Sequence, residues 1–363
     1  MIHKNNECRN TNVSMKGVIL HGGQGTRLRP LTHTGPKQLI NIAGKPISQW
    51  ALEKLINIGI REVAIILGEN NPTKVIEYYG DGSKFGVQIT YFYQGKARGI
   101  AEAVSRVREF TENEKFVVFL GDNVILDELD KFSCENCDAS ILLAKVQKPE
   151  QFGVAVLKGD SIVKLVEKPK QYISDYALVG VYMFNSEIFE CIESLKPSAR
   201  GELEITEAIQ MLIDKGKTVK HSVIEGWWKD TGNPGDLLEA NMKLLDRYAG
   251  ESDNGEVEKS SILGRVVIGK DAKIVNSKII GPAYIGDNAE IYDSIIGAYS
   301  SIGNFTKIRR SQISYSLIFE NSLLENVDIS DSIVGKTSVL ERSANELGSS
   351  RFIIGENTNI RVR

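Results

Sequence analysis

Hydrophobic and polar positions along the first 245 residues alternate between two patterns. Short β-branched apolar runs predict buried strands at residues 17–20, 63–67, 115–120 and 139–143. Between them, apolar residues recur at helical spacing and predict helices over residues 47–58, 101–110, 204–213 and 237–248. Strands that alternate with helices need crossover connections, so the pattern predicts an α/β fold with a Rossmann-like, mainly parallel sheet covered on both faces. Ligands of such sheets bind beyond the carboxyl ends of the strands, where we expect the functional residues.

The pattern changes after a polar stretch at residues 250–258, which is typical of a linker. Three later segments share the pattern Ile-Gly-x-x-x-x-Ile, at residues 268–274, 285–291 and 354–360, and aliphatic residues recur every five or six positions between them. This period fits a solenoid in which each short strand contributes one inward aliphatic side chain and three strands complete a coil. It resembles the hexapeptide repeats of left-handed parallel β-helices. We therefore expect a flexible leader (1–14), an α/β domain (15–249), a linker (250–258) and a β-helix domain (259–363).

Composition and charge restrict the partners. Hydrophobic residues make up 42% and charged residues 25% of the chain, as in ordinary globular proteins. The net charge of −3 provides no field for nucleic acid or an anionic membrane, so a phosphate ligand must be held by a local cluster. No apolar run approaches the roughly 20 residues of a membrane span. The four scattered cysteines predict no disulfide framework and favour a cytoplasmic location, with Cys134 and Cys137 interpreted as incidental surface thiols.

The most informative segment follows the first predicted strand and reads His-Gly-Gly-Gln-Gly-Thr-Arg-Leu-Arg-Pro over residues 21–30, with Pro-Lys-Gln at 36–38. Its three glycines allow the backbone to approach a ligand closely and expose N–H groups. Two arginines and a lysine add positive charge, which suits a triphosphate. The segment matches neither the dinucleotide fingerprint nor the Walker A pattern. A tight turn with solvated basic residues is the alternative.

Gly-Gly-x-Gly-Thr-Arg-Leu-x-Pro followed by Pro-Lys-Gln-Leu resembles the signature of the sugar-1-phosphate nucleotidylyltransferases, which have a nucleotidyltransferase A-type fold, and is most similar to that of the glucose-1-phosphate thymidylyltransferases. The resemblance covers residues 15 to about 248, and longer members carry a C-terminal repeat domain. It implies a Mg²⁺-dependent, homo-oligomeric enzyme that makes dTDP-glucose and pyrophosphate from dTTP and glucose 1-phosphate. UTP or another sugar 1-phosphate as substrate, and a non-catalytic subunit that binds nucleotide sugars, stay open.

The resemblance implies roles on the nucleotide side of the site. Arg27 and Lys37 would be catalytic and meet the phosphates. The residues that would bind the nucleotide are Gly22, Gly23, Gly25, Thr26, Gln94, Gly99 and Asp122. Gln94 ends a predicted strand at residues 88–93, and its amide can pair with both donor and acceptor edges of a pyrimidine. Lys96 and Arg98 make this loop unusually basic, which leaves the choice of base open.

Two aspartates are candidate ligands for Mg²⁺. Asp122 directly follows the strand predicted at residues 115–120, where a carboxylate is well placed to hold the ion. Asp230 lies in the segment Trp-Trp-Lys-Asp-Thr-Gly at residues 227–232. The resemblance assigns the metal to both carboxylates. A turn-forming Asp-Asn pair is the alternative for Asp122, and core packing is expected for at least one tryptophan.

A further group would bind the sugar phosphate: Gly153, Glu167, Lys168, Val179 and Arg200. The resemblance assigns the sugar hydroxyls to Glu167, the phosphate to Lys168 and Arg200, and backbone contacts to Gly153 and Val179. These residue types suit the ligand, because a carboxylate accepts from two vicinal hydroxyls and an arginine holds phosphate with two parallel bonds. Without the resemblance, a surface charge pair before Pro169 would be the commoner interpretation.

Some relatives that combine these two architectures also transfer acetyl groups on the β-helix, a reaction that usually needs a histidine base. The histidines of this chain are His3, His21, His33 and His221, so residues 256–363 contain none. We therefore discount acetyl transfer and expect the β-helix to serve in assembly or regulation.

Overall fold

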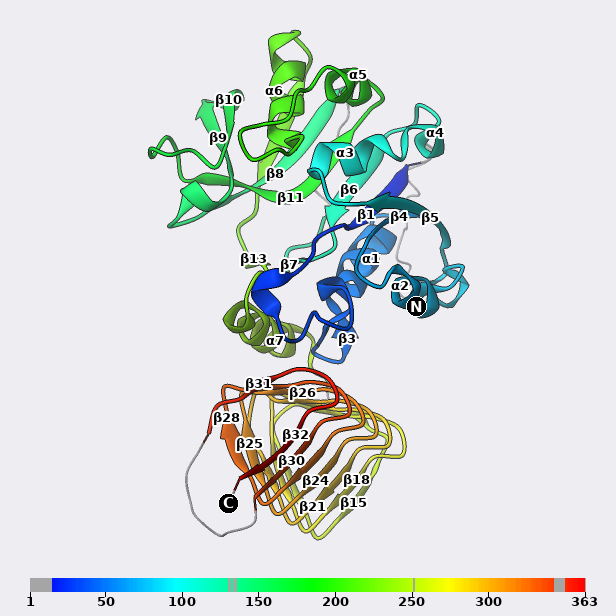
Figure 1. Ribbon diagram of the computed structural model, residues 1–363, viewed down its shortest axis with the longest axis vertical. Coiled ribbons are helices and arrows are strands. Elements are labelled where there is room, and N and C mark those ends of the chain that lie inside the picture. The colour runs from blue at the N-terminus through cyan, green and yellow to red at the C-terminus, as the bar shows by residue number, and fades with distance from the viewer. Residues whose placement is uncertain (1–14, 130–131, 133–135, 251, 343–349, 363) are drawn as a thin grey trace, which may run out of the picture.

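The computed structural model describes residues 15–129, 132, 136–250, 252–342 and 350–362. An α/β domain stands above a β-helix, with helix α7 (Pro234–Tyr248) between them (Figure 1). The leader expected at residues 1–14 lies outside the described residues.

The sheet of the α/β domain has the order β10-β9-β11-β6-β1-β4-β5, and β8 joins β11 to β12. Its strands are β1 (Lys16–His21), β4 (Glu62–Gly68), β5 (Gln88–Gly95), β6 (Phe116–Leu120), β8 (Ala139–Lys145), β9 (Gly153–Lys158), β10 (Ser161–Glu167), β11 (Tyr176–Phe184) and β12 (Val219–Val223). The predicted parallel arrangement is confirmed at the centre, where β6, β1, β4 and β5 run parallel. Antiparallel strands extend it, since β11 returns beside β6 and β9–β10 forms a hairpin. Short ribbons join β2 (Asn41–Ile42) to β3 (Lys45–Pro46), and β7 (Asn123–Ile125) to β13 (Trp228–Asp230).

Helices cover both faces of this sheet: α1 (Ile47–Asn57), α2 (Pro72–Tyr79), α3 (Ile100–Ser105), α4 (Arg108–Thr111), α5 (Glu187–Glu193) and α6 (Ile205–Asp214). Successive side chains of a strand point to opposite faces. Val18 and Leu20 of β1 accordingly pack with α3, α5 and α6, whereas Ile19 packs with α1 and α2. The helix expected over residues 101–110 is divided into α3 and α4, because the fully buried Val107 leaves the helical region at φ −103° and ψ 12°.

The β-helix consists of three parallel sheets (Figure 1), and the fold class predicted from the repeats, a left-handed parallel β-helix, is confirmed. The first sheet contains β14 (Ser252–Asp253), β17 (Val266–Ile268), β20 (Ala283–Ile285), β23 (Ser301–Ile302), β26 (Leu317–Ile318), β29 (Ile333–Val334) and β31 (Ile353–Ile354). The second contains β15 (Glu256–Glu258), β18 (Lys273–Val275), β21 (Glu290–Tyr292), β24 (Lys307–Arg309), β27 (Leu323–Glu325), β30 (Val339–Arg342) and β32 (Asn359–Val362). The third contains β16 (Ser261–Leu263), β19 (Lys278–Ile280), β22 (Ile295–Ile296), β25 (Gln312–Ser314) and β28 (Asp328–Ser330).

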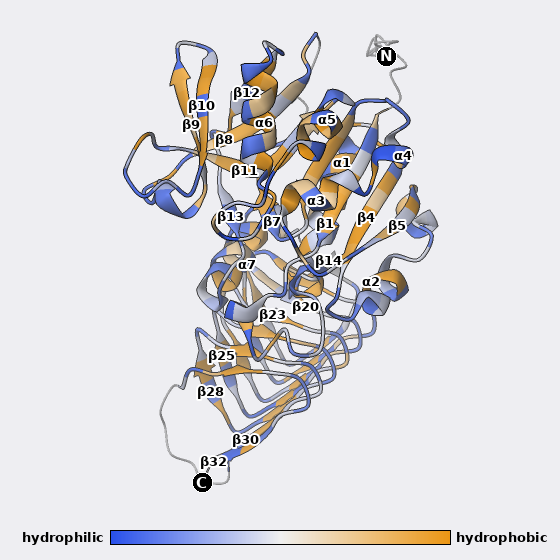
Figure 2. Cartoon of the chain, turned by 45° about the horizontal axis from the view of Figure 1, so that its top comes forward, coloured by the Kyte–Doolittle hydropathy of each residue, from blue (hydrophilic) through white to orange (hydrophobic). Residues whose placement is uncertain are grey.

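Each coil directs one aliphatic side chain inward from each sheet, and Figure 2 shows hydrophobic positions following the strands while the turns are polar. A serine ladder connects successive coils at one corner. Ser277 N donates to Ser260 Oγ (2.9 Å), Ser294 N to Ser277 Oγ (3.0 Å) and Ser311 N to Ser294 Oγ (3.1 Å), each 17 residues apart. These bonds satisfy backbone donors that the short strands leave unpaired at the corners.

Two further sequence expectations differ from the structure. Residues 252–253 and 256–258, within the expected linker, form the first strands of the β-helix, because their backbones pair in parallel with the next coil. Cys137 is buried and disulfide-bonded rather than a surface thiol, while Cys134 lies outside the described residues.

The α/β domain and the β-helix share a continuous interior. Leu28, Leu31 and Leu237 from the α/β domain form one hydrophobic cluster with Leu317 and Phe319 from the β-helix. A side chain at Gly44 would overlap the ring of Tyr284, so the two backbones are close. The β-helix is therefore joined to the α/β domain by a packed core.

Asn241 of α7 is the polar centre of this junction. It is fully buried and accepts from Ala43 N (2.9 Å) and Ser301 Oγ (2.7 Å), while its amide donates to Tyr299 O (2.9 Å).

We expect Asn241→Ala to lower the free energy of unfolding by about 2–4 kcal/mol, because buried groups of both domains lose their partner. Chemical denaturation measures this loss. The exposed Asn57→Ala is the control and should change the free energy by less than about 0.5 kcal/mol, and an equal effect of the two variants would contradict the assigned role of Asn241.

Candidate active site

The glycine-rich segment leaves the carboxyl end of β1 at the centre of the sheet. Gly25 has a φ of 63°, and a side chain there would lie 2.9 Å from Thr32. Gly23 lies against Lys37, because a Cβ atom would stand 3.3 Å from Lys37 Cε. Two short 3₁₀ turns follow, at Thr26–Leu28 and Lys37–Leu39, and they carry Arg27 and Lys37. The loop backbone thus lies next to its own basic side chains.

Asp122 and Asp230, about a hundred residues apart in the chain, are brought together by the β7–β13 ribbon. Asp230 pairs with Asn123 in its register, and Thr231 donates to the backbone oxygen of Asp122 from N (3.1 Å) and from Oγ1 (2.7 Å). Lys37 forms an ion pair with Asp122, and its Nζ lies 4.0 Å from Asp230 Oδ1. Lys37 therefore lies between the carboxylate of Asp122, in the turn between β6 and β7, and that of Asp230 at the end of β13.

Burial shifts the pKa values of these groups. It raises the pKa of Asp230 to about 6, helped by the charge of Asp122. For Asp122, burial acts in the same direction, but Lys37 outweighs it and lowers the pKa. Burial likewise opposes the charge of Lys37, yet the two aspartates raise its pKa. At neutral pH, Lys37 therefore stays protonated and Asp122 stays ionised. The pKa of Asp230, about 6, lies only about one unit below neutral pH.

The two aspartates fit a divalent metal site. Oδ1 of Asp230 is buried and has no hydrogen-bond partner among the described residues, so it is an orphaned acceptor that a cation would satisfy. Carboxylate oxygens are the ligands that Mg²⁺ prefers, and this ion usually takes one or two of them plus substrate phosphates. The described residues contain no group of three or more His, Cys, Asp or Glu side chains that could hold a metal.

Gln94 lies beside the glycine loop, since a side chain on Gly22 would overlap its Oε1. Its amide nitrogen donates to Glu102 Oε2 (2.6 Å) and Gly99 O (3.3 Å). The sequence predicts that the Gln94 amide offers both a donor and an acceptor to a base. In the structure its nitrogen is already bonded, so Oε1 is the atom that can accept from a base. Gly99, at φ 111°, leaves no space for a side chain because the backbone of Leu203 is adjacent.

The candidate sugar-phosphate residues gather at β9, β10 and the turn before α6. Glu167 accepts from Thr206 Oγ1 (3.2 Å), and its Oε1 lies 3.6 Å from Arg200 Nη1 and 4.0 Å from Lys168 Nζ. Burial raises the pKa of Glu167, with Glu204 adding to the effect. A side chain on Gly153 would stand 3.0 Å from Glu167 Oε2, so only glycine leaves this carboxylate accessible.

Val179 differs from the others because its side chain is fully buried in the core. Its side chain is therefore unavailable to a ligand, and a contact through its backbone stays a prediction. The next residue, Gly180, has a φ of 83° and lies at an irregularity in the pairing of β11 with β8.

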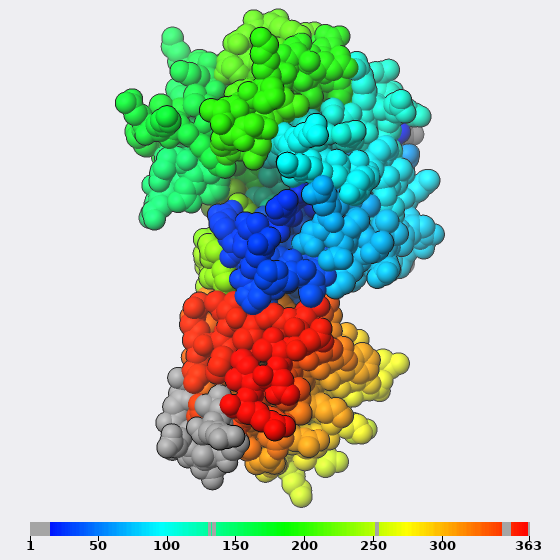
Figure 3. Space-filling model, in the orientation of Figure 1, coloured from blue at the N-terminus to red at the C-terminus, as the bar shows by residue number. Residues whose placement is uncertain are grey.

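A cavity of about 670 Å³ extends from Arg27 and Asp230 to Lys168, and Figure 3 shows the surface hollowed between the N-terminal segment and the segment around residues 150–200. It therefore joins one member of each predicted group: phosphate, metal and sugar phosphate. Residues that the sequence analysis missed also line it: Lys148, Gln151, Trp228, Lys229 and Asn233. Lys148 precedes and Gln151 ends a 3₁₀ turn that comes just before Phe152-Gly153. Their closeness in the sequence to the predicted site residue Gly153 is the signal that could have indicated them.

The chain is similar to known proteins over most of its length. Residues 16–247 match the family model described as nucleotidyl transferase. The chain is 41% identical over 357 residues to the low-salt glycan biosynthesis nucleotidyltransferase Agl11 of Haloferax volcanii, covering 96% of this chain and 100% of that protein. It is 41% identical over 356 residues to a glucose-1-phosphate thymidylyltransferase of Streptomyces antibioticus, with the same coverage.

A solved structure from Bacillus anthracis, in complex with a sucrose and provisionally assigned as a glucose-1-phosphate thymidylyltransferase, is also similar. Its TM-score is 0.60 at 38% identity, and the match covers 66% of this chain and 98% of that one. None of the helices in the described part of the chain has the length and hydrophobicity that a membrane span requires.

Proposed function

The chain belongs to the nucleotidyl transferase family, and we propose that it makes dTDP-glucose and pyrophosphate from dTTP and glucose 1-phosphate. The observation that carries this proposal is the cavity that joins Arg27 and Asp230 to Lys168, because a sugar phosphate and a triphosphate must meet there. Full-length similarity to a named thymidylyltransferase supports the choice of substrates.

The reaction needs no general base, because the sugar phosphate is already ionised at neutral pH. One of its phosphate oxygens attacks the α-phosphorus in line, a P–O bond forms, and the bond to pyrophosphate breaks. The protein has to bring two polyanions together and stabilise the charge on the leaving group. Arg27 and Lys37 stabilise the α-phosphate and pyrophosphate, while Lys168 and Arg200 hold the phosphate of the sugar.

Asp122 and Asp230 would hold Mg²⁺, which neutralises charge on the triphosphate when bound. The orphaned Oδ1 of Asp230 and the ion pair of Lys37 with Asp122 support this assignment. In the protein alone, Lys37 supplies the positive charge between the two carboxylates and keeps them in position. A homo-oligomeric state and a cytoplasmic location stay predictions from the sequence.

Metal binding should weaken as the pH falls through about 6. Asp230 has a raised pKa of about 6, so below that pH its carboxyl is protonated and loses its affinity for a cation. The apparent affinity for Mg²⁺ should then fall by about tenfold per pH unit. The Mg²⁺ concentration for half-maximal turnover, measured between pH 5 and 8, shows this. Because the substrates also titrate, Asp230→Asn is the control, and it should remove this component of the dependence; an unchanged profile in the variant would contradict the assignment.

Glu167→Gln should raise the KM for glucose 1-phosphate by about tenfold, because the charged acceptor for two hydroxyls is replaced by a neutral amide. The KM for the triphosphate should stay the same. The half-buried Glu202, which also pairs with Arg200 (2.6 Å), provides the control: Glu202→Gln should change either KM by less than about twofold. A larger effect on the triphosphate than on the sugar would contradict the sugar-binding role.

Substrate selectivity tests which nucleoside triphosphate the enzyme uses. Comparing kcat/KM for dTTP, UTP, CTP, ATP and GTP with glucose 1-phosphate should show a preference for dTTP. A preference for UTP would leave the proposed mechanism unchanged but assign a different base specificity. The basic residues Lys96 and Arg98 in the loop after Gln94 are a reason to test this outcome. Absence of turnover with every triphosphate and with other sugar phosphates would favour a regulatory subunit that binds nucleotide sugars.

A further inference from the structure

The loop that carries Arg27 is held from two sides. On the α/β side, Thr32 Oγ1 donates to Gly25 O (2.7 Å), and Asn70 Nδ2 donates to Thr32 O and Gly35 O (both 3.0 Å). These bonds fix the two ends of the segment between residues 25 and 35. In the middle of the segment, Leu28 and Leu31 share a hydrophobic cluster with Phe319 of the β-helix, and Pro30 contacts Gly355.

Those contacts are apolar and close. Leu28 is fully buried, and Leu31 and Phe319 are 7% and 6% exposed within one shared cluster. The backbone of Gly355 lies directly against Pro30, because a Cβ on Gly355 would stand 3.2 Å from both Cβ and O of Pro30. Figure 3 shows the last coils of the β-helix directly below the N-terminal segment. The middle of the loop therefore rests on the β-helix.

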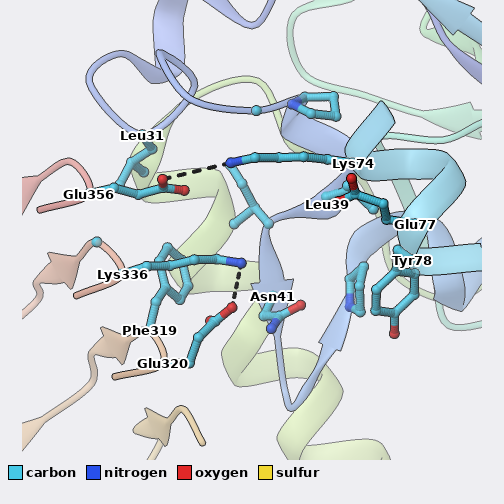
Figure 4. Close-up of a pocket in the computed structure, with 15 residues that line it drawn as sticks. Leu31, Leu39, Asn41, Lys74, Glu77, Tyr78, Phe319, Glu320, Lys336 and Glu356 are labelled. Carbon is cyan, nitrogen blue, oxygen red and sulfur yellow. Dashed lines mark ion pairs between the residues drawn. The ribbon is translucent and has the colours of Figure 1, made fainter. Parts of the chain in front are cut away.

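One ion pair joins the same surfaces, and a second lies on the β-helix, beside a pocket of about 400 Å³ (Figure 4). Lys74 of α2 lies 3.8 Å from Glu356, and Lys336 pairs with Glu320 across the β-helix side of the pocket. Leu31 and Phe319 both line this pocket. The junction is thus apolar under the loop and charged at its edge, an arrangement that fixes the orientation of the last coils.

Arg27 is the immediate neighbour of this supported segment. It lies on a single 3₁₀ turn with Leu28, and its guanidinium stands next to Gly232, where a Cβ would be 2.9 Å from Nη2. We infer that Phe319 and Gly355 of the β-helix are positioning residues: by supporting residues 28–31 they fix Arg27 against the phosphates of the nucleotide. This inference rests on the role of Arg27 in the proposed function, and it gives the β-helix a part in turnover.

Phe319→Ala removes the support for residues 28–31. It changes none of the residues that line the 670 Å³ cavity of the candidate active site. We expect kcat to fall by roughly tenfold to a hundredfold, the range for a misplaced catalytic group, with an unchanged KM for glucose 1-phosphate. Phe319→Leu should recover most of the loss. The control is Leu324→Ala, which removes an equally buried side chain from the β-helix core away from the junction and should leave kcat within about twofold.

A double-mutant cycle separates positioning from general loss of structure. If Phe319 acts through Arg27, Phe319→Ala should cost almost nothing in an Arg27→Ala background. Multiplicative losses, or a normal kcat in Phe319→Ala, would overturn the inference while leaving the proposed function intact. Normal turnover in Arg27→Ala alone would overturn both the inference and the role of Arg27. If Phe319→Ala does not fold, Gly355→Val takes its place in the same double-mutant cycle. This variant displaces Pro30 without opening a cavity.

Discussion

Asp122→Asn is expected to lower turnover by about three orders of magnitude. The substitution keeps the size of the side chain and the backbone oxygen that accepts from Thr231 (3.1 and 2.7 Å), so the β7–β13 ribbon should stay in place. What is lost is one of two negative charges for the metal and the ion pair with Lys37. Steady-state pyrophosphate release measures the loss, and the Mg²⁺ concentration for half-maximal turnover should rise.

The matched control is Asp81→Asn, an exposed aspartate in the turn between α2 and β5 whose carboxylate accepts from the nearby Ser83 N (2.9 Å). It should leave turnover unchanged. Near-normal turnover of Asp122→Asn with an unshifted Mg²⁺ dependence would place the metal elsewhere and contradict the site.

Lys37→Ala is expected to lower turnover by about 10²–10³, the usual effect of removing one donor that stabilises a developing charge. The fold should persist but become less stable, because Asp122 and Asp230 then face each other without the ammonium between them. Breaking such a buried pair costs about 3–5 kcal/mol.

Magnesium distinguishes the two roles of Lys37. Added Mg²⁺ should restore much of the thermal stability of Lys37→Ala, because it neutralises the two carboxylates, but it should not restore turnover. Lys45→Ala, which removes a half-exposed lysine paired with Glu53 (2.8 Å), is the control and should retain turnover. Recovery of full activity by metal alone would show that Lys37 only keeps the carboxylates apart.

The fold could be predicted because its signals are local. Alternating apolar runs gave the central strands and most helices, and the repeat at residues 268–274 and 285–291 indicated the β-helix. The split between α3 and α4 could not be predicted, since Val107 follows helical spacing and leaves the helix only to fill the core. Residues 252–258 were read as a linker because their polar sequence lacks inward aliphatic residues except Val257.

Candidate residues for the site could be singled out from the sequence, but the contacts that bring them together could not. No local pattern indicates that β7 pairs with β13, because each is a three-residue strand and the two are a hundred residues apart. The same limit applies to the bond from Gln94 to Glu102 and to the contact of Gly355 with Pro30. These contacts are set by tertiary packing, which the sequence pattern does not specify.

The junction changes how the β-helix is understood. A domain that served only in assembly would need no packed core with the α/β domain, yet Asn241 and Phe319 connect the two through buried contacts. The repeat domain therefore contributes to the stability of the α/β domain, and in our account also to the position of Arg27.

The most direct test of the account is pyrophosphate release from dTTP and glucose 1-phosphate in the presence of Mg²⁺, with dTDP-glucose quantified in the same reaction. The account predicts one dTDP-glucose for each pyrophosphate, and no release when either substrate or Mg²⁺ is omitted. Pyrophosphate released from dTTP without glucose 1-phosphate, or folded protein that binds both substrates and releases none, would contradict it.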